Sequence, residues 1–67
     1  MMIYEDARRW QYTVRPGLGG TSFSVFYRKP KKSWHSVRAL PWHDREIDAE
    51  ADLIAYANKH QMKKVEE

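Results

Sequence analysis

Two short turn segments divide the first part of the chain into three runs that are typical of β-strands. Residues 16–20 carry one proline and three glycines, and residues 29–32 carry a proline between lysines. Proline restricts the backbone and glycine adopts positive φ without steric cost, so both segments favour a tight reversal. The runs that they separate are residues 10–15, 22–28 and 34–40, each rich in β-branched and aromatic side chains. Because the connections are short, we expect the three runs to pair as an antiparallel meander.

A single helix is expected over residues 44–64, after a proline at position 41 that ends the third run. Leu53, Ile54 and Ala57 recur at helical spacing and would give this helix an apolar side. Such a side needs a partner, and the alternation of the runs supplies one face of a sheet for it. The residues expected under the helix are Trp10, Tyr12, Val14, Phe23, Val25, Tyr27, Val37 and Ala39.

The chain is therefore predicted to form one small α+β domain with the order β-β-β-α. Its parts would be an N-terminal segment 1–8, a three-stranded antiparallel meander 9–40, the C-terminal helix 44–64 packed against it, and a frayed tail 65–67. A chain of this length buries only about 60% of the surface that its unfolded state exposes. A core of that size leaves little room for a deep active-site cavity, so we expect a binding module and no enzyme.

The chain contains no cysteine, which excludes disulfides, thiolate metal sites and cysteine nucleophiles. A small secreted domain would usually carry disulfides, so a reducing compartment is favoured. No apolar run approaches the roughly 18 residues of a membrane span, and residues 1–6 do not resemble a signal peptide. We therefore expect a cytoplasmic protein that makes no membrane contact and takes no cofactor and no small-molecule substrate.

The charge of the chain is distributed unevenly. No Asp or Glu occurs in residues 7–43, whereas this segment carries eight Lys or Arg residues. The acids gather instead in the predicted helix, where Asp44 or Asp48 would cap the first turn. Surface charge of this kind also serves solubility, but a long basic segment without a single acid suggests a polyanionic partner.

The face of the predicted sheet away from the helix collects arginine and aromatic side chains. By alternation each run contributes one arginine to it, and Phe26 and Trp34 lie there among small polar residues. Arginine binds phosphate or the acceptor edge of guanine with two hydrogen bonds, and aromatic rings stack on bases. The sequence therefore predicts a nucleic-acid interface, preferably for double-stranded DNA. Its residues are Arg15, Phe26, Arg28, Lys29, Lys31, Lys32, Trp34 and Arg38.

A protein interface on the same face is the alternative. Exposed aromatic residues often mark contacts between chains, so Phe26 and Trp34 together with a strand edge would suit a protein partner or a homodimer. Ile3 and Tyr4 of the N-terminal segment are also available to cover part of these rings. Both interpretations place the contact on the sheet and not on the helix.

The predicted layout resembles the arm-binding N-terminal domains of phage and transposon tyrosine integrases and the related plant AP2-type domains. The matching parts are the runs 10–15, 22–28 and 34–40 and the alanine-bearing helical stretch 49–57. Members of these families typically read the DNA major groove with the sheet, so the resemblance implies DNA contact by Arg15, Arg28 and Arg38. The double-stranded-RNA-binding fold begins with a helix that the pattern here does not predict, which favours DNA over RNA.

Two further patterns do not amount to a functional motif. His35, His43 and His60 are not at the spacing of a metal site. Residues 17–21 are rich in glycine but lack the Gly-Lys-Ser/Thr ending of a phosphate loop, and they are expected to join two strands. We therefore expect neither a metal site nor a catalytic one.

Overall fold

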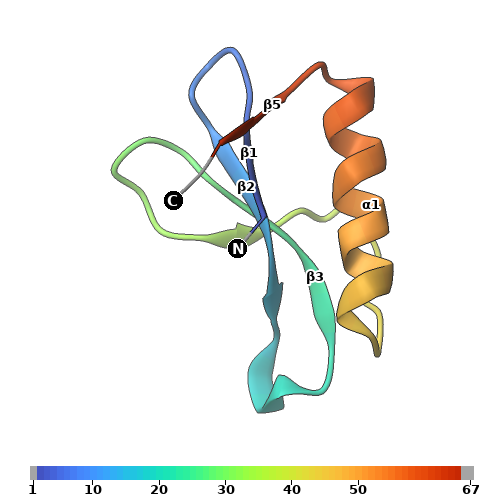
Figure 1. The fold of residues 1–67 in the computed structure, drawn as a ribbon. Helices are drawn as coiled ribbons and strands as arrows, with labels where there is room; N and C mark the ends of the chain where they lie inside the picture. The colour runs from blue at the N-terminus through green and yellow to red at the C-terminus, as the bar shows by residue number, and fades with distance from the viewer. Residues whose placement is uncertain (1, 66–67) are drawn as a thin grey trace.

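The computed structural model describes residues 2–65 and shows one helix lying against one face of a five-stranded sheet (Figure 1). The strand order is β4-β3-β2-β1-β5, and every neighbouring pair is antiparallel. The elements in chain order are β1 (Ile3–Glu5), β2 (Gln11–Pro16), the short 3₁₀ turn η1 (Leu18–Gly20), β3 (Phe23–Arg28), β4 (His35–Ser36), α1 (Glu46–Lys59) and β5 (Lys63–Val65). The predicted α+β class with one helix is confirmed, whereas the predicted number of three strands is wrong.

The two additional strands extend the sheet beyond β2. β1 falls in the predicted N-terminal segment 1–8 and pairs with β2, so that Ile3 lies opposite Thr13. β5 falls where the helix and the frayed tail were expected to meet, and it pairs with the outer side of β1. Residues 66–67 of the expected tail lie outside the described residues. Each of these strands has three residues, which is too short to show alternation in the sequence.

The helix ends at Lys59 and not at residue 64, because the chain adopts a left-handed conformation just after it. Gln61 has a φ of 54°, and its N–H binds the carbonyl of Asn58 at 3.3 Å. The N–H of Met62 binds the carbonyl of Ala57 at 2.9 Å. This pair of bonds is a Schellman motif, which usually carries glycine at the left-handed position. With glutamine there, the sequence contains no stop signal, and the following lysines look like a continuation of the helix.

The helix begins without a side-chain cap, so the expectation that Asp44 or Asp48 caps it is wrong. The approach to the helix is anchored by His43 instead. Its backbone pairs with Phe23 through two hydrogen bonds of 2.7 and 2.9 Å, and its Nε2 lies 2.7 Å from Oδ2 of Asp52 in α1. His43 therefore connects the edge of β3 to the helix.

The third predicted run, 34–40, forms only the two-residue strand β4. The N–H of Val37 still binds the carbonyl of Val25 at 2.9 Å, but the chain then turns, and the N–H of Leu40 binds the carbonyl of Val37 at 3.2 Å. Ala39 is therefore exposed in this turn, and its predicted place under the helix is wrong.

The hydrophobic core lies between α1 and the sheet. Its buried members are Tyr12 of β2, Val25 of β3, Val37 after β4 and Leu53 of α1. Trp10, Val14 and Tyr27 are partly buried and pack against this cluster. Alternation assigned Tyr12, Val25, Val37, Trp10, Val14 and Tyr27 to the helix side, and the structure confirms this for these six. Phe23, which was expected there too, is half-buried and is not among the residues of this cluster.

Replacing Leu53 by alanine is expected to remove a large part of the free energy of unfolding, because Leu53 is fully buried in the middle of this core. A buried Leu→Ala change costs about 2–5 kcal/mol, and a domain of this size has a net stability of about 3–5 kcal/mol. Urea denaturation followed by circular dichroism measures the loss. The neighbouring Ile54→Ala variant is the control, because Ile54 is 41% exposed and should lose less than about 1 kcal/mol. Equal losses in the two variants would contradict this packing of the helix.

Candidate nucleic-acid interface

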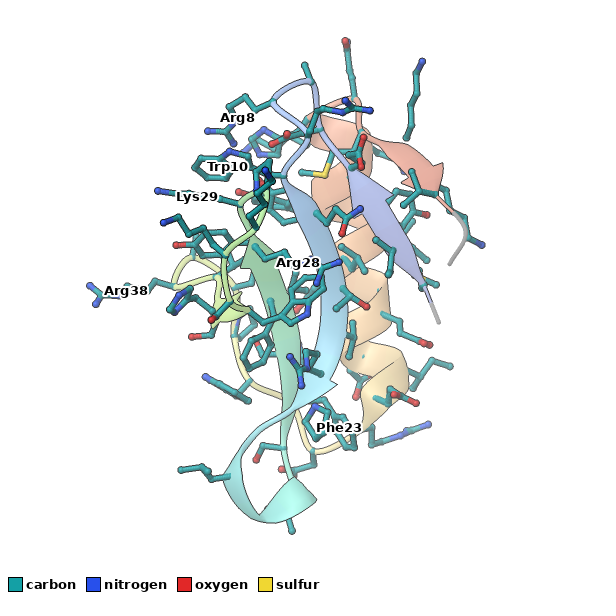
Figure 2. The ribbon with its side chains drawn as sticks, turned by 90° about the vertical axis from the view of Figure 1, so that its left-hand side faces the viewer. Arg8, Trp10, Phe23, Arg28, Lys29 and Arg38 are labelled. Carbon is teal, nitrogen blue, oxygen red and sulfur yellow. The ribbon has the colours of Figure 1, made fainter. Side chains whose placement is uncertain are left out.

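The face of the sheet away from α1, here named the open face, carries a row of polar side chains across three strands. Glu5, Gln11 and Arg28 are aligned in the register of β1, β2 and β3. The amide of Gln11 donates to Oε1 of Glu5 at 3.2 Å. Its oxygen accepts hydrogen bonds from Nε and Nη2 of Arg28 at 3.1 and 2.8 Å. This row holds Arg28 in the middle of the open face, where Figure 2 shows it.

Two arginines and two aromatic rings lie together on the same face. Cζ of Arg28 lies 4.6 Å from the centroid of the Trp34 ring. Cζ of Arg15 lies 5.9 Å from the centroids of both Trp34 and Phe26. The Phe26 ring in turn meets Trp42 edge-on at 5.8 Å. The structure therefore brings four of the predicted site residues into one cluster, with the arginines placed by contacts worth about 0.5–1 kcal/mol each.

The centre of the open face is buried, although the sequence suggests a polar surface there. Thr13 lies between Ile3 and Phe26 in the strand register, and the relative exposure of Ile3 and Thr13 is 4% and 1%. The Thr13 hydroxyl donates to the carbonyl of Met2 at 2.7 Å, which satisfies the buried polar group. Ile3 is thus buried on this face beside Thr13, whereas Tyr4 packs against the core on the helix side.

A groove of about 440 Å³ lies between the β1–β2 turn and the β3–β4 loop, at one end of the open face. The residues of this basic groove are Glu5, Arg9, Gln11, Arg28, Lys29, Pro30, Lys31 and Lys32. Five of them are cationic, and Glu5 is the one carboxylate in the lining. Nε of Arg9 lies 3.9 Å from Oε2 of Glu5, and such a long pair with an exposed arginine offsets little of the positive charge. The groove therefore suits an anionic ligand.

Two of the cationic residues in the basic groove have a left-handed backbone conformation. Arg9 has a φ of 68° and Lys31 a φ of 64°. Each belongs to a tight turn, since the N–H of Arg9 binds the carbonyl of Asp6 at 2.9 Å and the N–H of Lys32 binds that of Lys29 at 3.0 Å. Glycine is the usual residue at positive φ, so both cations are held at a conformational cost.

The β1–β2 turn that carries Arg9 is organised by the carboxylate of Asp6. Its Oδ1 accepts hydrogen bonds from the N–H of Arg8 at 2.9 Å and of Trp10 at 3.0 Å. Its Oδ2 accepts from Nη2 of Arg8 at 2.9 Å and from the Tyr12 hydroxyl at 3.1 Å. Burial raises the pKa of Asp6, but these hydrogen bonds, led by that of the Arg8 side chain, outweigh burial and hold the pKa below 3.8. Burial and the hydrogen bond to Asp6 raise the pKa of Tyr12 to about 12.

Arg38 lies apart from the other predicted site residues. It projects from the β4 edge of the molecule, whereas Arg28 faces outward from the middle of the open face (Figure 2). Arg38 lines a hollow on the helix side, together with Val37 and Tyr56. Alternation fails to place it because β4 ends at Ser36 and the chain turns before Arg38.

Two residues of the site are not assigned by the sequence. Arg9 enters the basic groove because β1 and β2 form a hairpin, and β1 was not expected. Trp42 reaches Phe26 because the chain returns along β3 after β4, where His43 pairs with Phe23. The sequence offers one signal for Arg9, which is an arginine beside a short turn. It offers no comparable signal for Trp42.

Comparisons of the chain with protein-family models, with curated proteins and with solved structures find no match. The resemblance to integrase arm-binding and AP2-type domains therefore stays a prediction. Within residues 2–65, no three His, Asp or Glu side chains are grouped so as to hold a metal ion. The helix of this described part is too short and too polar to cross a membrane.

Replacing Asp6 by asparagine is expected to lower the free energy of unfolding at neutral pH by about 1–3 kcal/mol, because a charged acceptor of several hydrogen bonds is lost. The pKa of Asp6 is lowered in the folded state, so its contribution is present above 3.8 and disappears as the pH falls through the folded value. Urea denaturation at a series of acid pH values measures this dependence. The variant should lose less stability on acidification than the parent chain, whereas Asp44→Asn, at an exposed position, should follow the parent. Parallel profiles for the parent and Asp6→Asn would refute this role of Asp6.

Proposed function

We propose that this chain is a nucleic-acid-binding module that contacts double-stranded DNA, in preference to RNA, with the open face and the basic groove. The observation that carries the proposal is the basic groove, where five cationic side chains from two loops and β3 face one carboxylate. Lysine and arginine that neutralise phosphates release the counterions of a nucleic acid, which favours binding. Arg28 belongs both to the groove and to the arginine and aromatic cluster, so the two form one continuous surface.

The lysines of the β3–β4 loop supply contacts to phosphate in this proposal. Lys29, Lys31 and Lys32 are all exposed. A lysine ammonium acts as a point charge on a flexible stem, so it needs no fixed orientation to meet a phosphate. Lys31 occupies a position where glycine would fit at lower cost, and this supports a use for its charge.

Arg28 supplies a contact of fixed orientation. Gln11 accepts hydrogen bonds from two of its nitrogen atoms, and the Trp34 ring lies beside its guanidinium group. A guanidinium has five N–H donors, so the remaining ones are available to phosphate oxygens or to the acceptor edge of guanine. A side chain that is held before binding loses less conformational entropy when the ligand arrives.

Contact with another protein is the second candidate function. The exposed apolar residues favour a place for it other than the predicted one at Phe26 and Trp34. Phe26 and Trp34 are half-buried beside arginines. Leu18 is instead fully exposed at the end of the β2–β3 hairpin, and Trp42 is 48% exposed. The edge strand β5 is short and carries two lysines, which discourages pairing with another sheet. Sedimentation at several protein concentrations tests for a homodimer, because the mass of a monomer at every concentration would exclude one.

The affinity for a duplex of random sequence is expected to fall steeply with salt. With about five phosphate contacts, the logarithm of the association constant should fall against the logarithm of the salt concentration with a slope of about −4.5. Fluorescence anisotropy of a labelled duplex at several salt concentrations measures this slope. The double variant Lys31→Gln/Lys32→Gln should make the slope shallower by about 2, because each lost phosphate contact removes about one counterion.

The matched control for this experiment is the double variant Lys59→Gln/Lys64→Gln. It removes the same charge from exposed positions at the end of α1 and in β5, away from the basic groove, and should leave the slope unchanged. The proposal fails if the duplex does not bind at low salt, or if the two double variants lose the same affinity.

A further inference from the structure

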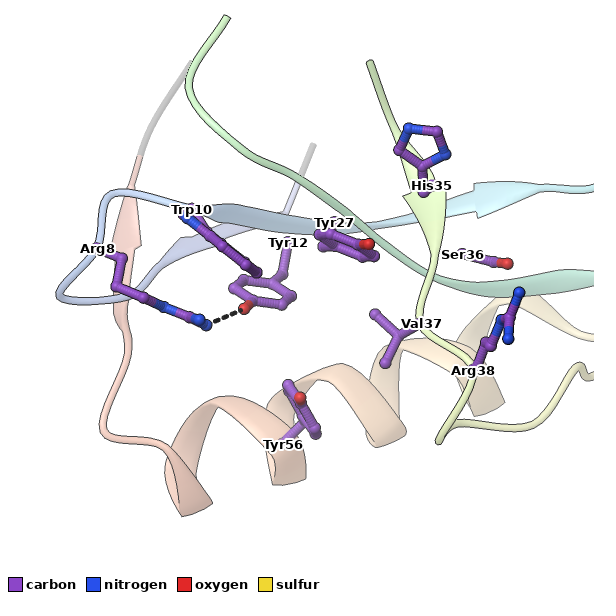
Figure 3. A pocket seen from close by; sticks show the side chains of 9 residues that line it. All are labelled: Arg8, Trp10, Tyr12, Tyr27, His35, Ser36, Val37, Arg38 and Tyr56. Atoms are coloured by element: carbon purple, nitrogen blue, oxygen red, sulfur yellow. Dashed lines mark hydrogen bonds between the residues drawn. The ribbon is translucent and has the colours of Figure 1, made fainter. Parts of the chain in front are cut away.

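A second groove lies on the helix side of the sheet, between the strands and α1 (Figure 3). It has a volume of about 570 Å³. The residues that define this aromatic groove are Arg8, Trp10, Tyr12, Tyr27, Arg38 and Tyr56. Figure 3 shows the four rings between Arg8 at one end and Arg38 at the other. The open face and the basic groove use none of these side chains.

The rings of the aromatic groove form a continuous wall. Trp10 and Tyr27 stack with their centroids 5.8 Å apart and an angle of 19° between the planes. Tyr12 lies 6.4 Å from Tyr27 and 5.8 Å from Tyr56, and it is buried beneath both. Tyr27 belongs to β3 and Tyr56 to α1, and both keep part of their surface exposed. A planar group that enters between them would therefore contact rings from the sheet and from the helix.

The charges around the aromatic groove select an anionic ligand. Cζ of Arg8 lies 3.6 Å from the centroid of the Trp10 ring, and Nζ of Lys29 lies 5.0 Å from it. These cations already occupy the electron-rich ring, so a cationic ligand would gain little and would be repelled. Arg8 is paired with Asp6 at 2.9 Å, which leaves Arg38 in the lining of the groove, and Lys29 beside the Trp10 ring, to meet a negative group. A flat aromatic ring with an attached phosphate satisfies both the rings and the charges.

The aromatic groove is connected to the basic groove through the β3–β4 loop. A smaller hollow of about 200 Å³ lies between them. It shares Lys29 and Lys32 with the basic groove, and Tyr27 with the aromatic groove. A nucleic-acid strand whose phosphates follow these lysines would reach the rings without leaving the protein surface.

We infer that the aromatic groove binds an unpaired nucleobase of a DNA strand whose phosphates lie in the basic groove, an inference that rests on the proposed function. A base inside a duplex is stacked on its neighbours and cannot enter between Tyr27 and Tyr56 unless it leaves the stack. The preferred ligand is therefore a duplex that continues into a single-stranded extension. The open face and the basic groove hold its phosphates, and the aromatic groove takes a base of the extension.

The test compares a blunt duplex with the same duplex carrying a short single-stranded extension, either intact or made of abasic nucleotides. The two extensions have the same phosphates, so the difference in affinity between them reports the bases alone. Stacking of one base on an aromatic wall corresponds to an affinity gain of about fivefold to a hundredfold. We expect the intact extension to bind tighter than the abasic one by that factor at a fixed salt concentration.

A variant tests whether the aromatic groove causes this gain in affinity for the intact extension. Tyr27→Leu should bind the intact and abasic extensions equally, while its affinity for the blunt duplex stays unchanged, because Tyr27 does not line the basic groove. Tyr4→Leu is the matched control, since Tyr4 also packs against the core on the helix side but does not line the aromatic groove. This control should keep the full gain.

Equal affinity of the parent chain for intact and abasic extensions, with the blunt duplex still bound, would overturn the inference and leave the proposed function standing. This comparison needs no variant, so it remains decisive even if Tyr27→Leu does not fold. Failure of every one of these DNAs to bind at low salt would remove the proposed function and the inference together.

Discussion

The packing of Leu53 against Tyr12 and Val25 is the contact on which the rest of the structure depends. Leu53 is fully buried, and the small side chains of Ala49 and Ala57, four residues to either side, are buried with it, so the helix lies close to the strands. Burial of one such leucine contributes about 1.5–3 kcal/mol, a large share of the stability of a domain of this size. Within residues 2–65 one helix covers one face of the sheet, and no second layer covers the other.

The open face therefore has to be sealed by its own side chains, and this links the fold to the proposed function. Thr13 is buried between its neighbours in the register, and the ring of Trp34 is flanked by Arg15 and Arg28. The same arginines that shield the sheet remain charged groups at its surface, where Gln11 holds Arg28 and both arginines lie beside the Trp34 ring. The face of the sheet that the helix leaves uncovered is thus the surface on which these arginines lie, beside the basic groove.

The local sequence pattern predicts the long elements of this fold. It fails where strand pairing or a single backbone conformation determines the structure. β2 and β3 have six residues each, so their alternation is visible and assigns Tyr12 and Val25 to the core. β1 and β5 are short, and the pairing between them joins segments at opposite ends of the described chain. The left-handed Gln61 ends the helix without any residue that signals an end. The candidate site divides in the same way: alternation places Arg28 on the open face, but it misplaces Arg38, which follows a strand that stops early.

Mapping of amide chemical shifts in the ¹⁵N-labelled chain during titration with a DNA duplex at low salt tests the central claim most directly. That claim is that the open face and the basic groove together form the contact surface. We expect the amides of β2, β3, the β1–β2 turn and the β3–β4 loop to shift, those of α1 to stay in place, and added salt to reverse the shifts. Shifts that are absent, or that concentrate on α1, would contradict the assignment of this face.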